Sequence, residues 1–127
     1  MPGHWVLARL GKRVLRPGGM ELTRRMLNAL QMTSEDDVVE FAPGMGITAK
    51  LTLKANPASY TAVERDDAAA RIVSGYLTGN SRRCVVGNAS NTGLPSESAS
   101  VVYGEAMLTM QSDETKCAIV REAFRLL

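Results

Sequence analysis

The sequence predicts an α/β fold built on a parallel sheet of four strands with helices between them. Short apolar runs alternate along the chain with longer segments whose apolar residues recur at helical spacing. Strands joined by helices of this length pair in parallel through right-handed crossovers, so a parallel sheet is expected. A length of 127 residues suits one such domain and no more.

The strands and helices follow one another in a regular order. Strands are expected at residues 38–41, 60–63, 83–86 and 101–103, and helices at about 20–31, 47–54, 66–77 and from 113 to the last residues. Asn56-Pro57 ends the second helix, since proline cannot continue it. The last helix is expected to bury one apolar face, formed by Cys117, Val120, Phe124 and Leu127. Residues 88–100, rich in serine and asparagine, are expected to form a loop.

Charge and composition exclude several classes of protein. The net charge of +2 is too small to indicate nucleic-acid binding, and no apolar run approaches the roughly 20 residues that span a bilayer. The basic residues before position 30 are Arg9, Lys12, Arg13, Arg16, Arg24 and Arg25, which face only Glu21. We therefore describe residues 1–127 as a single domain, in which residues 1–33 form a basic, solvated lead-in and a helix.

The cysteine and histidine content excludes other chemistries. Cys84 and Cys117 are far apart and lack the spacing of a metal site, which favours buried thiols in a reduced, cytoplasmic protein. His4 is the single histidine, so a histidine-centred metal site or catalytic triad is excluded. No metal is expected.

A glycine turn follows the first predicted strand. Glu40 ends that strand region, and Gly44 and Gly46 come next, where the absence of a Cβ atom leaves the backbone open to a ligand. Glu64 lies 20 residues beyond Gly44, at the end of the second strand. A carboxylate at about this distance binds a ribose hydroxyl in nucleotide-binding α/β folds, so the pattern predicts a nucleoside site. By itself, such a glycine pair is as often a plain turn.

Four segments in this order resemble the motifs of the class I S-adenosylmethionine-dependent methyltransferases. They are Glu40-Phe41-Ala42-Pro43-Gly44-Met45-Gly46, Val63-Glu64-Arg65-Asp66, Gly87-Asn88-Ala89 followed by Gly93-Leu94-Pro95, and Val101-Val102-Tyr103-Gly104-Glu105-Ala106. The resemblance implies a Rossmann-like sheet with strand order 3-2-1-4, as four of the family's usual seven strands. It departs from the family pattern at Ala42, where the first glycine is usual, at Asn88, where an aspartate is usual, and at Ser100.

The resemblance implies S-adenosylmethionine as the cofactor and methyl transfer as the activity. The implied cofactor-binding residues are Glu40, Ala42, Gly44, Gly46, Glu64, Arg65, Asn88, Ala89 and Glu105. Of these, Glu64 would bind the ribose hydroxyls and Asn88 the adenine amino group. The sulfonium already activates the methyl group, so the protein mainly aligns donor and acceptor. The sequence identifies neither the acceptor nor a catalytic base, for which Glu105 and Tyr103 are candidates.

Other interpretations stay open. Gly44-x-Gly46-x-x-Ala49 also satisfies the dinucleotide fingerprint of nicotinamide-dependent oxidoreductases, for which Glu64 would serve equally well. The motifs cover four strands, which predicts a truncated enzyme, or a non-catalytic cofactor-binding or scaffold subunit completed by a partner chain. Without a fifth strand, residues 101–103 would form an open apolar edge, and we expect self-association there.

Overall fold

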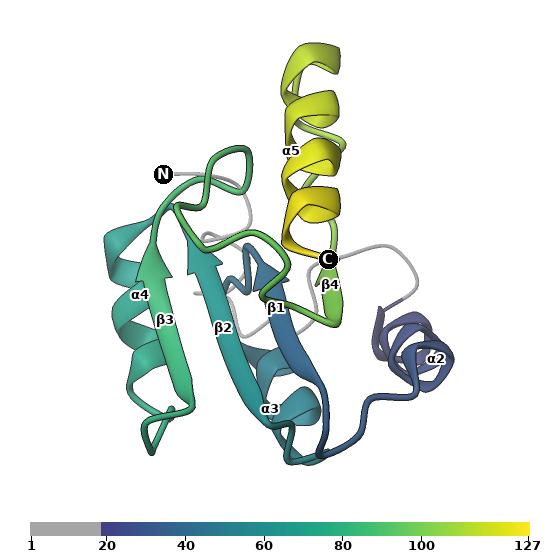
Figure 1. Ribbon diagram of the computed structural model, residues 1–127, viewed down its shortest axis with the longest axis vertical. Helices are drawn as coiled ribbons and strands as arrows, with labels where there is room; N and C mark the ends of the chain where they lie inside the picture. Colours follow the sequence, from purple (N-terminus) through teal and green to yellow (C-terminus); the bar gives the residue numbers. More distant parts are fainter. Residues whose placement is uncertain (1–18) are drawn as a thin grey trace. The chain divides into compact units, whose positions relative to one another are not determined.

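The computed structural model describes residues 19–127 and divides them between two units (Figure 1). The first unit ends at Gln31 and contains α2 (Gly19–Leu30), in which Glu21 and Arg25 form an exposed ion pair of 3.6 Å. The second unit runs from Met32 to Leu127 and contains the sheet. The predicted basic residues before α2 lie outside the described residues, whereas Arg24 and Arg25 are exposed on the helix.

The second unit is built on the predicted parallel sheet. Its strands are β1 (Asp37–Phe41), β2 (Ser59–Glu64), β3 (Arg82–Val86) and β4 (Val101–Gly104), and they lie in the order β3-β2-β1-β4. All three pairings are parallel. The prediction of an α/β fold with strand order 3-2-1-4 is therefore confirmed.

Two helices cover one face of this sheet, behind it in Figure 1. They are α3 (Ile47–Leu53) and α4 (Asp67–Ser74), the latter capped by the Asp66 carboxylate, which accepts from the Ala69 N–H at 2.9 Å. This face carries a buried polar cluster beneath α3. The Tyr60 and Tyr103 hydroxyls both donate to Oε1 of Glu40, at 2.6 and 3.0 Å, and the Thr52 hydroxyl bonds that of Tyr103 at 2.5 Å.

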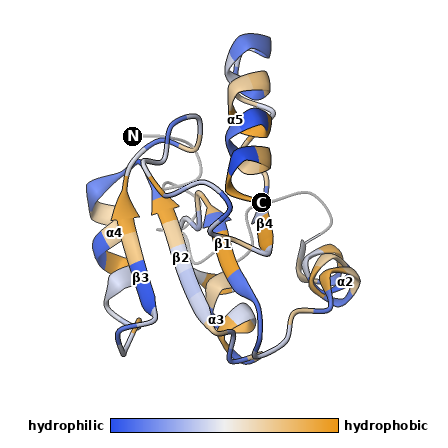
Figure 2. Cartoon of the chain, in the orientation of Figure 1, coloured by the Kyte–Doolittle hydropathy of each residue, from blue (hydrophilic) through white to orange (hydrophobic). Residues whose placement is uncertain are grey.

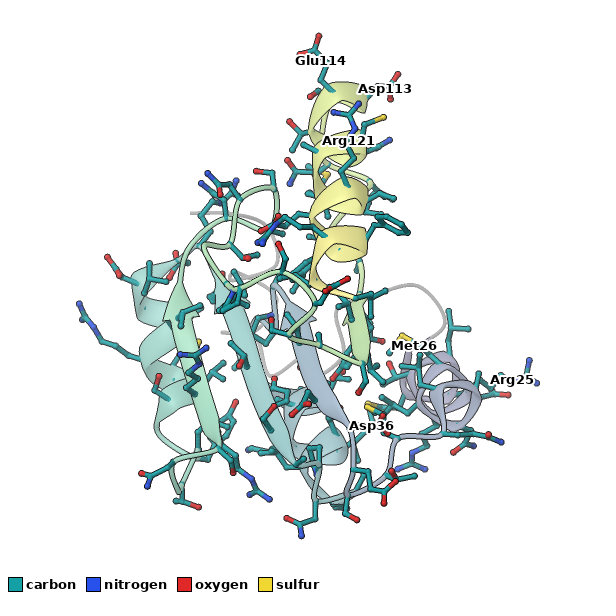
Figure 3. The ribbon with its side chains drawn as sticks, in the orientation of Figure 1. Arg25, Met26, Asp36, Asp113, Glu114 and Arg121 are labelled. Carbon is teal, nitrogen blue, oxygen red and sulfur yellow. The ribbon has the colours of Figure 1, made fainter. Side chains whose placement is uncertain are left out.

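The opposite face carries the apolar core, which is closed by α5 (Asp113–Leu126) and by the loop between β3 and β4. The buried residues of this core are Val39, Phe41, Val63, Leu94, Ala99, Ile119 and Leu126. The Ser112 hydroxyl caps α5 by accepting from the Thr115 N–H. Asp113 and Glu114 follow in its first turn and project from its outer end (Figure 3). Acidic side chains at this end stabilise the helix, because they interact favourably with the positive end of its dipole.

The prediction of which face of the last helix is buried is wrong. Cys117, Val120, Phe124 and Leu127 are exposed, Phe124 by 81%, and the buried residues are Ile119, Glu122 and Leu126. Apolar and polar turns accordingly alternate along α5 in Figure 2. The face that α5 buries includes Glu122, which lies beneath the loop that precedes β4 and receives hydrogen bonds from Thr92. These hydrogen bonds allow a carboxylate to be buried in place of the more apolar stripe.

The helix predicted at about 66–77, whose residues Ala69, Ile72, Val73, Tyr76 and Leu77 recur at helical spacing, is also only partly as expected. Ala69 and Val73 are buried against the sheet, but Ile72 is exposed. Tyr76 and Leu77 lie beyond the end of α4 at Ser74. The helix ends there, and Tyr76 turns back toward the glycine turn that follows β1, where its hydroxyl donates to the Met45 carbonyl.

β4 is an edge strand of the sheet. Within residues 19–127 it pairs with β1 alone, so its outer side has no strand beside it there. Over the same residues, no helix is long and apolar enough to cross a bilayer, and no group of three or more histidine, cysteine or acidic side chains is arranged to bind a metal. Both cysteines are free thiols.

Candidate functional site

The parallel register brings the carboxyl ends of the strands to one edge of the sheet. Phe41 lies opposite Val63 on one side and Gly104 on the other. On the next pair of strands, Glu64 lies opposite Val86, and the Gly87 N–H donates to the Glu64 carbonyl at 3.0 Å. Open α/β sheets bind ligands at this edge, and every turn that the sequence singled out begins there.

The Glu64 carboxylate joins two of these turns. Its Oε2 accepts from the Gly44 N–H at 3.2 Å and its Oε1 from the Asp66 N–H at 3.1 Å. The side chain is 7% exposed. The glycine turn and the carboxylate are therefore in direct contact, as the sequence pattern predicted for a nucleoside site.

The two glycines of the turn serve different purposes. Both have left-handed backbone conformations, with φ of +59° at Gly44 and +79° at Gly46. A Cβ atom at Gly44 would meet nothing within 4 Å, so the backbone there faces open space. At Gly46 a Cβ atom would lie 1.6 Å from the Tyr76 hydroxyl oxygen. The expectation that Gly46 leaves room for a ligand is wrong, because Tyr76 fills that room.

Tyr76 holds the glycine turn from the side of α4. Its hydroxyl donates to the Met45 carbonyl at 2.5 Å, and Nζ of Lys50 lies 4.6 Å from the centre of its ring. Such a cation–π contact contributes on the order of 0.5–1 kcal/mol at an exposed site. Tyr76 thus fixes the position of the turn, a role that its place in the sequence did not indicate.

Ala42 occupies the place of the family's first glycine and takes a glycine-like conformation. Its φ is +51°, and its N–H donates to the Val63 carbonyl at 2.8 Å. A left-handed conformation costs a residue with a Cβ atom roughly 1–2 kcal/mol. The departure from the family pattern therefore costs backbone strain, in addition to placing a methyl group near the proposed site.

Ala42→Gly is expected to raise the free energy of unfolding by about 0.5–1 kcal/mol, because relief of the strain exceeds the entropy that glycine loses on folding. Urea unfolding measures the change. As a control, Ala49→Gly, in the buried and ordinary helical backbone of α3, should lower the same free energy. A destabilised Ala42→Gly variant would contradict the assignment of strain to this position.

Glu40, one of the predicted cofactor-binding residues, lies one residue before the carboxyl end of β1 and is buried in the fold. It is 2% exposed, and its Oε1 receives the two tyrosine hydroxyls described above. Burial, followed by the nearby Glu40 charge, raises the pKa of both Tyr60 and Tyr103 well above the ordinary range. These hydroxyls therefore stay protonated and act as hydrogen-bond donors within the fold.

Glu105 follows β4 and lies against the first turn of α3. The Thr48 hydroxyl donates to Oε1 of Glu105 at 2.5 Å. The carboxylate is half-buried, which distinguishes it from Glu40. Glu105 is thus held next to the helix that begins at the glycine turn.

The remaining predicted residues lie on the neighbouring turns. Arg65 is exposed beside Glu64. Asn88 is exposed just after β3, and its carbonyl accepts from the Asn91 N–H at 3.0 Å. Ala89 is half-buried and packs against the apolar core. The turns after β2 and β3 are adjacent through the Gly87–Glu64 hydrogen bond.

Two surface hollows lie apart from these residues. One, of about 430 Å³, lies between α4 and β3 and includes Asp67, Ser74 and Cys84 in its wall. The other, of about 300 Å³, includes Asp37 and Ser59, at the amino ends of β1 and β2. None of the predicted site residues lines either of these two hollows.

Sequence reasoning missed three contributors to this architecture. Tyr76 holds the glycine turn, Thr48 holds Glu105, and Glu122 holds the loop after β3. Only Glu122 had a detectable signal, since Glu122 and Arg125 are spaced by three residues and can pair on a helix. Tyr76 and Thr48 find their partners through tertiary structure, which spacing along the chain does not reveal.

Comparison with known sequences identifies relatives of greater length. An uncharacterized protein of Haemophilus influenzae is 33% identical over 129 aligned residues, which cover 98% of this chain and 51% of that protein. Ribosomal RNA small subunit methyltransferase A of Maridesulfovibrio salexigens is 33% identical over 63 residues, which cover 50% of this chain and 23% of that enzyme. No protein-family model matches the sequence. The chain spans about half the length of the first of these relatives and less of the second.

Comparison with solved structures identifies the fold. An S-adenosylmethionine-dependent methyltransferase from Mesorhizobium loti superposes with a TM-score of 0.68 and 12% identity, over 81% of this chain and 47% of that one. Phosphoethanolamine N-methyltransferase 1 of Haemonchus contortus was solved with phosphoethanolamine and S-adenosylhomocysteine. It superposes with a TM-score of 0.72 and 15% identity, over 83% of this chain and 22% of that enzyme. The chain therefore has the Rossmann-like fold of the class I S-adenosylmethionine-dependent methyltransferases. Residues 19–127 comprise four strands of that domain.

Proposed function

We propose that this chain binds S-adenosylmethionine at the carboxyl ends of β1, β2 and β3, as the cofactor-binding part of a methyltransferase. The observation that carries the proposal is the contact between Gly44 and Glu64, in which a carboxylate of the kind that accepts from ribose hydroxyls lies beside open backbone. The fold supports the same assignment, because methyltransferases of this fold are named for that cofactor and one is solved with S-adenosylhomocysteine.

The residues at the strand tips fit the proposed cofactor. A carboxylate has about four lone-pair sites, and the described N–H donors use one on each oxygen of Glu64. Two sites are left for the two ribose hydroxyls. The open space at Gly44 allows the ligand to approach the backbone, and Asn88 presents a side-chain carbonyl that accepts from the adenine amino group.

In the proposed reaction, the cofactor supplies an activated methyl group, and this chain holds it in place. Tyr103 is not suited to act as the base, since its buried hydroxyl already donates to Glu40. Glu105 is half-buried at the tip of β4 and is the better placed of the two candidates to meet an acceptor or the methionine end of the cofactor.

Calorimetric titration of the protein with S-adenosylmethionine, S-adenosylhomocysteine and NAD tests this proposal. We expect saturable binding of the first two ligands and none of NAD. Tighter binding of NAD would overturn the proposal in favour of the oxidoreductase interpretation. Absence of binding by all three ligands would contradict the proposal that this chain binds a cofactor. Binding of S-adenosylmethionine without methyl transfer to any offered acceptor would favour the interpretation as a non-catalytic subunit.

We further propose that two copies of this chain associate through β4 and the exposed stripe of α5. The outer side of β4 is unpaired by any strand among the described residues, and the neighbouring helix exposes Val120, Phe124 and Leu127. Unpaired edges and contiguous apolar side chains favour pairing with another chain. Light scattering across a concentration series should show a dimer that Phe124→Lys converts to a monomer.

Val86→Lys is the matched control for this association, because Val86 is an exposed apolar residue on the other edge strand, β3. It should leave the dimer intact. A monomer at all concentrations, or equal effects of the two substitutions, would contradict association through β4 and α5.

A further inference from the structure

The loop between β3 and β4 carries Asn88 and Ala89 and is attached along much of its length to the last helix, α5. Residues 87–100 contain no helix or strand, apart from one isolated bridge between Asn88 and Asn91. A segment of this length without regular structure needs other partners for its backbone groups. Several of these partners come from the last two turns of α5.

Glu122 is the centre of this attachment. Its Oε2 accepts from the Thr92 N–H at 2.7 Å and from the Thr92 hydroxyl at 2.6 Å. The carboxylate is buried, and Arg125 pairs with it through Nε at 2.6 Å and Nη2 at 2.8 Å. The Arg125 hydrogen bonds, and secondarily those of Thr92, lower the pKa of Glu122 to about 2. Glu122 is therefore ionised at any pH near neutrality.

Arg125 extends the attachment along the loop. Its Nη2 donates to the Leu94 carbonyl at 2.7 Å and its Nη1 to the Ser96 hydroxyl at 2.9 Å. The Glu97 N–H donates to the Arg125 carbonyl at 3.0 Å, and the Ala99 N–H donates to the Leu126 carbonyl at 2.9 Å. The loop thereby satisfies carbonyl groups that the end of a helix leaves without partners.

The attachment is adjacent to the residues proposed to bind adenine. The hydrogen bond from the Asn91 N–H to the Asn88 carbonyl closes a tight turn, and Thr92 follows that turn directly. Ala89 packs on the same apolar core as Leu94 and Leu126. A change in the position of Thr92 would therefore shift the end of the Asn88–Asn91 turn, which carries the residues proposed to face the base.

We propose that Glu122 and Arg125 are positioning residues that hold the loop after β3 so that Asn88 recognises the 6-amino group of adenine. This inference rests on the proposed cofactor function. Both side chains bond loop residues and each other, so they act on the base through the loop. A rigid acceptor discriminates between purines more strongly than a mobile one, because its geometry is fixed before binding.

The test compares two ligands that differ at the base, S-adenosylhomocysteine and S-inosylhomocysteine, which carries a carbonyl in place of the amino group. Calorimetry gives the ratio of their dissociation constants for the wild type and for Glu122→Gln. Glu122→Gln removes the charge that Arg125 and Thr92 bind. We expect the preference for the adenine ligand to fall by about fivefold or more, the equivalent of one hydrogen bond.

Glu114→Gln is the control, since Glu114 is exposed in the first turn of the same helix, and it should leave the preference unchanged. Hydrogen exchange at the Thr92 amide should be faster in Glu122→Gln than in the control. If Glu122→Gln does not fold, Thr92→Val carries the test, because it removes one of the two donors from Thr92 and should lower the preference in the same direction.

A folded Glu122→Gln variant with the wild-type preference would overturn the positioning role and leave the proposed cofactor function intact. If the wild type binds neither ligand, the proposed function fails, and this inference fails with it. Equal binding of the two ligands by the wild type would overturn base recognition by Asn88 while still supporting cofactor binding.

Discussion

Gly46→Ala should destabilise the fold by about 2 kcal/mol, the largest effect that we expect from a single added methyl group. The backbone at φ of +79° costs alanine about 0.5–1 kcal/mol, after the entropy that glycine loses on folding is subtracted. In addition, the new Cβ atom would displace the Tyr76 hydroxyl and break its hydrogen bond to the Met45 carbonyl. Loss of this hydrogen bond should lower the free energy of unfolding by about 0.5–1.5 kcal/mol. Urea unfolding, monitored by circular dichroism, measures the total.

Gly44→Ala is the matched control for this substitution. Its backbone has a similar φ of +59°, but the added Cβ atom meets nothing within 4 Å. We therefore expect only the net backbone cost of about 0.5–1 kcal/mol that also applies to Ala42. In the Tyr76→Ala background, Gly46→Ala should likewise cost no more than this, since the clash is gone. Equal losses for the two glycine substitutions in the wild-type background would contradict the role of Tyr76.

Glu64→Ala should weaken the binding of S-adenosylhomocysteine by about 5- to 150-fold, which corresponds to roughly 1–3 kcal/mol for hydrogen bonds to a charged group. The loss follows from two effects. The ribose hydroxyls lose their acceptor, and the N–H groups of Gly44 and Asp66 lose the carboxylate that holds the two turns together. Calorimetry on variants whose folding has been checked measures the loss.

Two further variants separate binding from folding. Glu64→Gln keeps one carbonyl oxygen and should lose less affinity than Glu64→Ala. Glu35→Ala changes an exposed carboxylate in the turn before β1, at the opposite end of the sheet, and should bind as the wild type does. Wild-type affinity in a folded Glu64→Ala variant would remove Glu64 from the proposed site.

The strands and their order were predictable because each strand is a short apolar run bounded by turn residues. The predicted strand at residues 38–41 differs from β1 by a single residue at its start, and β2 and β4 are longer than predicted by a residue or two. The contact between Gly44 and Glu64 was also predictable, since parallel pairing brings the two strand tips together and spacing alone selects the partners.

The faces of the helices and the role of Gly46 were not predictable from periodicity. The stripe of α5 that contains Val120 and Phe124 is more apolar than the buried one, which includes Glu122. Burial of that carboxylate is possible because Thr92 and Arg125, which the apolar pattern does not take into account, supply its hydrogen bonds. Tyr76 likewise reaches Gly46 from the segment beyond α4, through tertiary contact alone.

A crystal structure of the protein with bound S-adenosylhomocysteine is the most direct test of the proposed site. We predict that both ribose hydroxyl oxygens lie within hydrogen-bonding distance of the Glu64 carboxylate, about 2.5–3.0 Å, with the ligand passing over the open side of Gly44. Ligand bound elsewhere, with Glu64 still contacting only Gly44 and Asp66, would contradict the account.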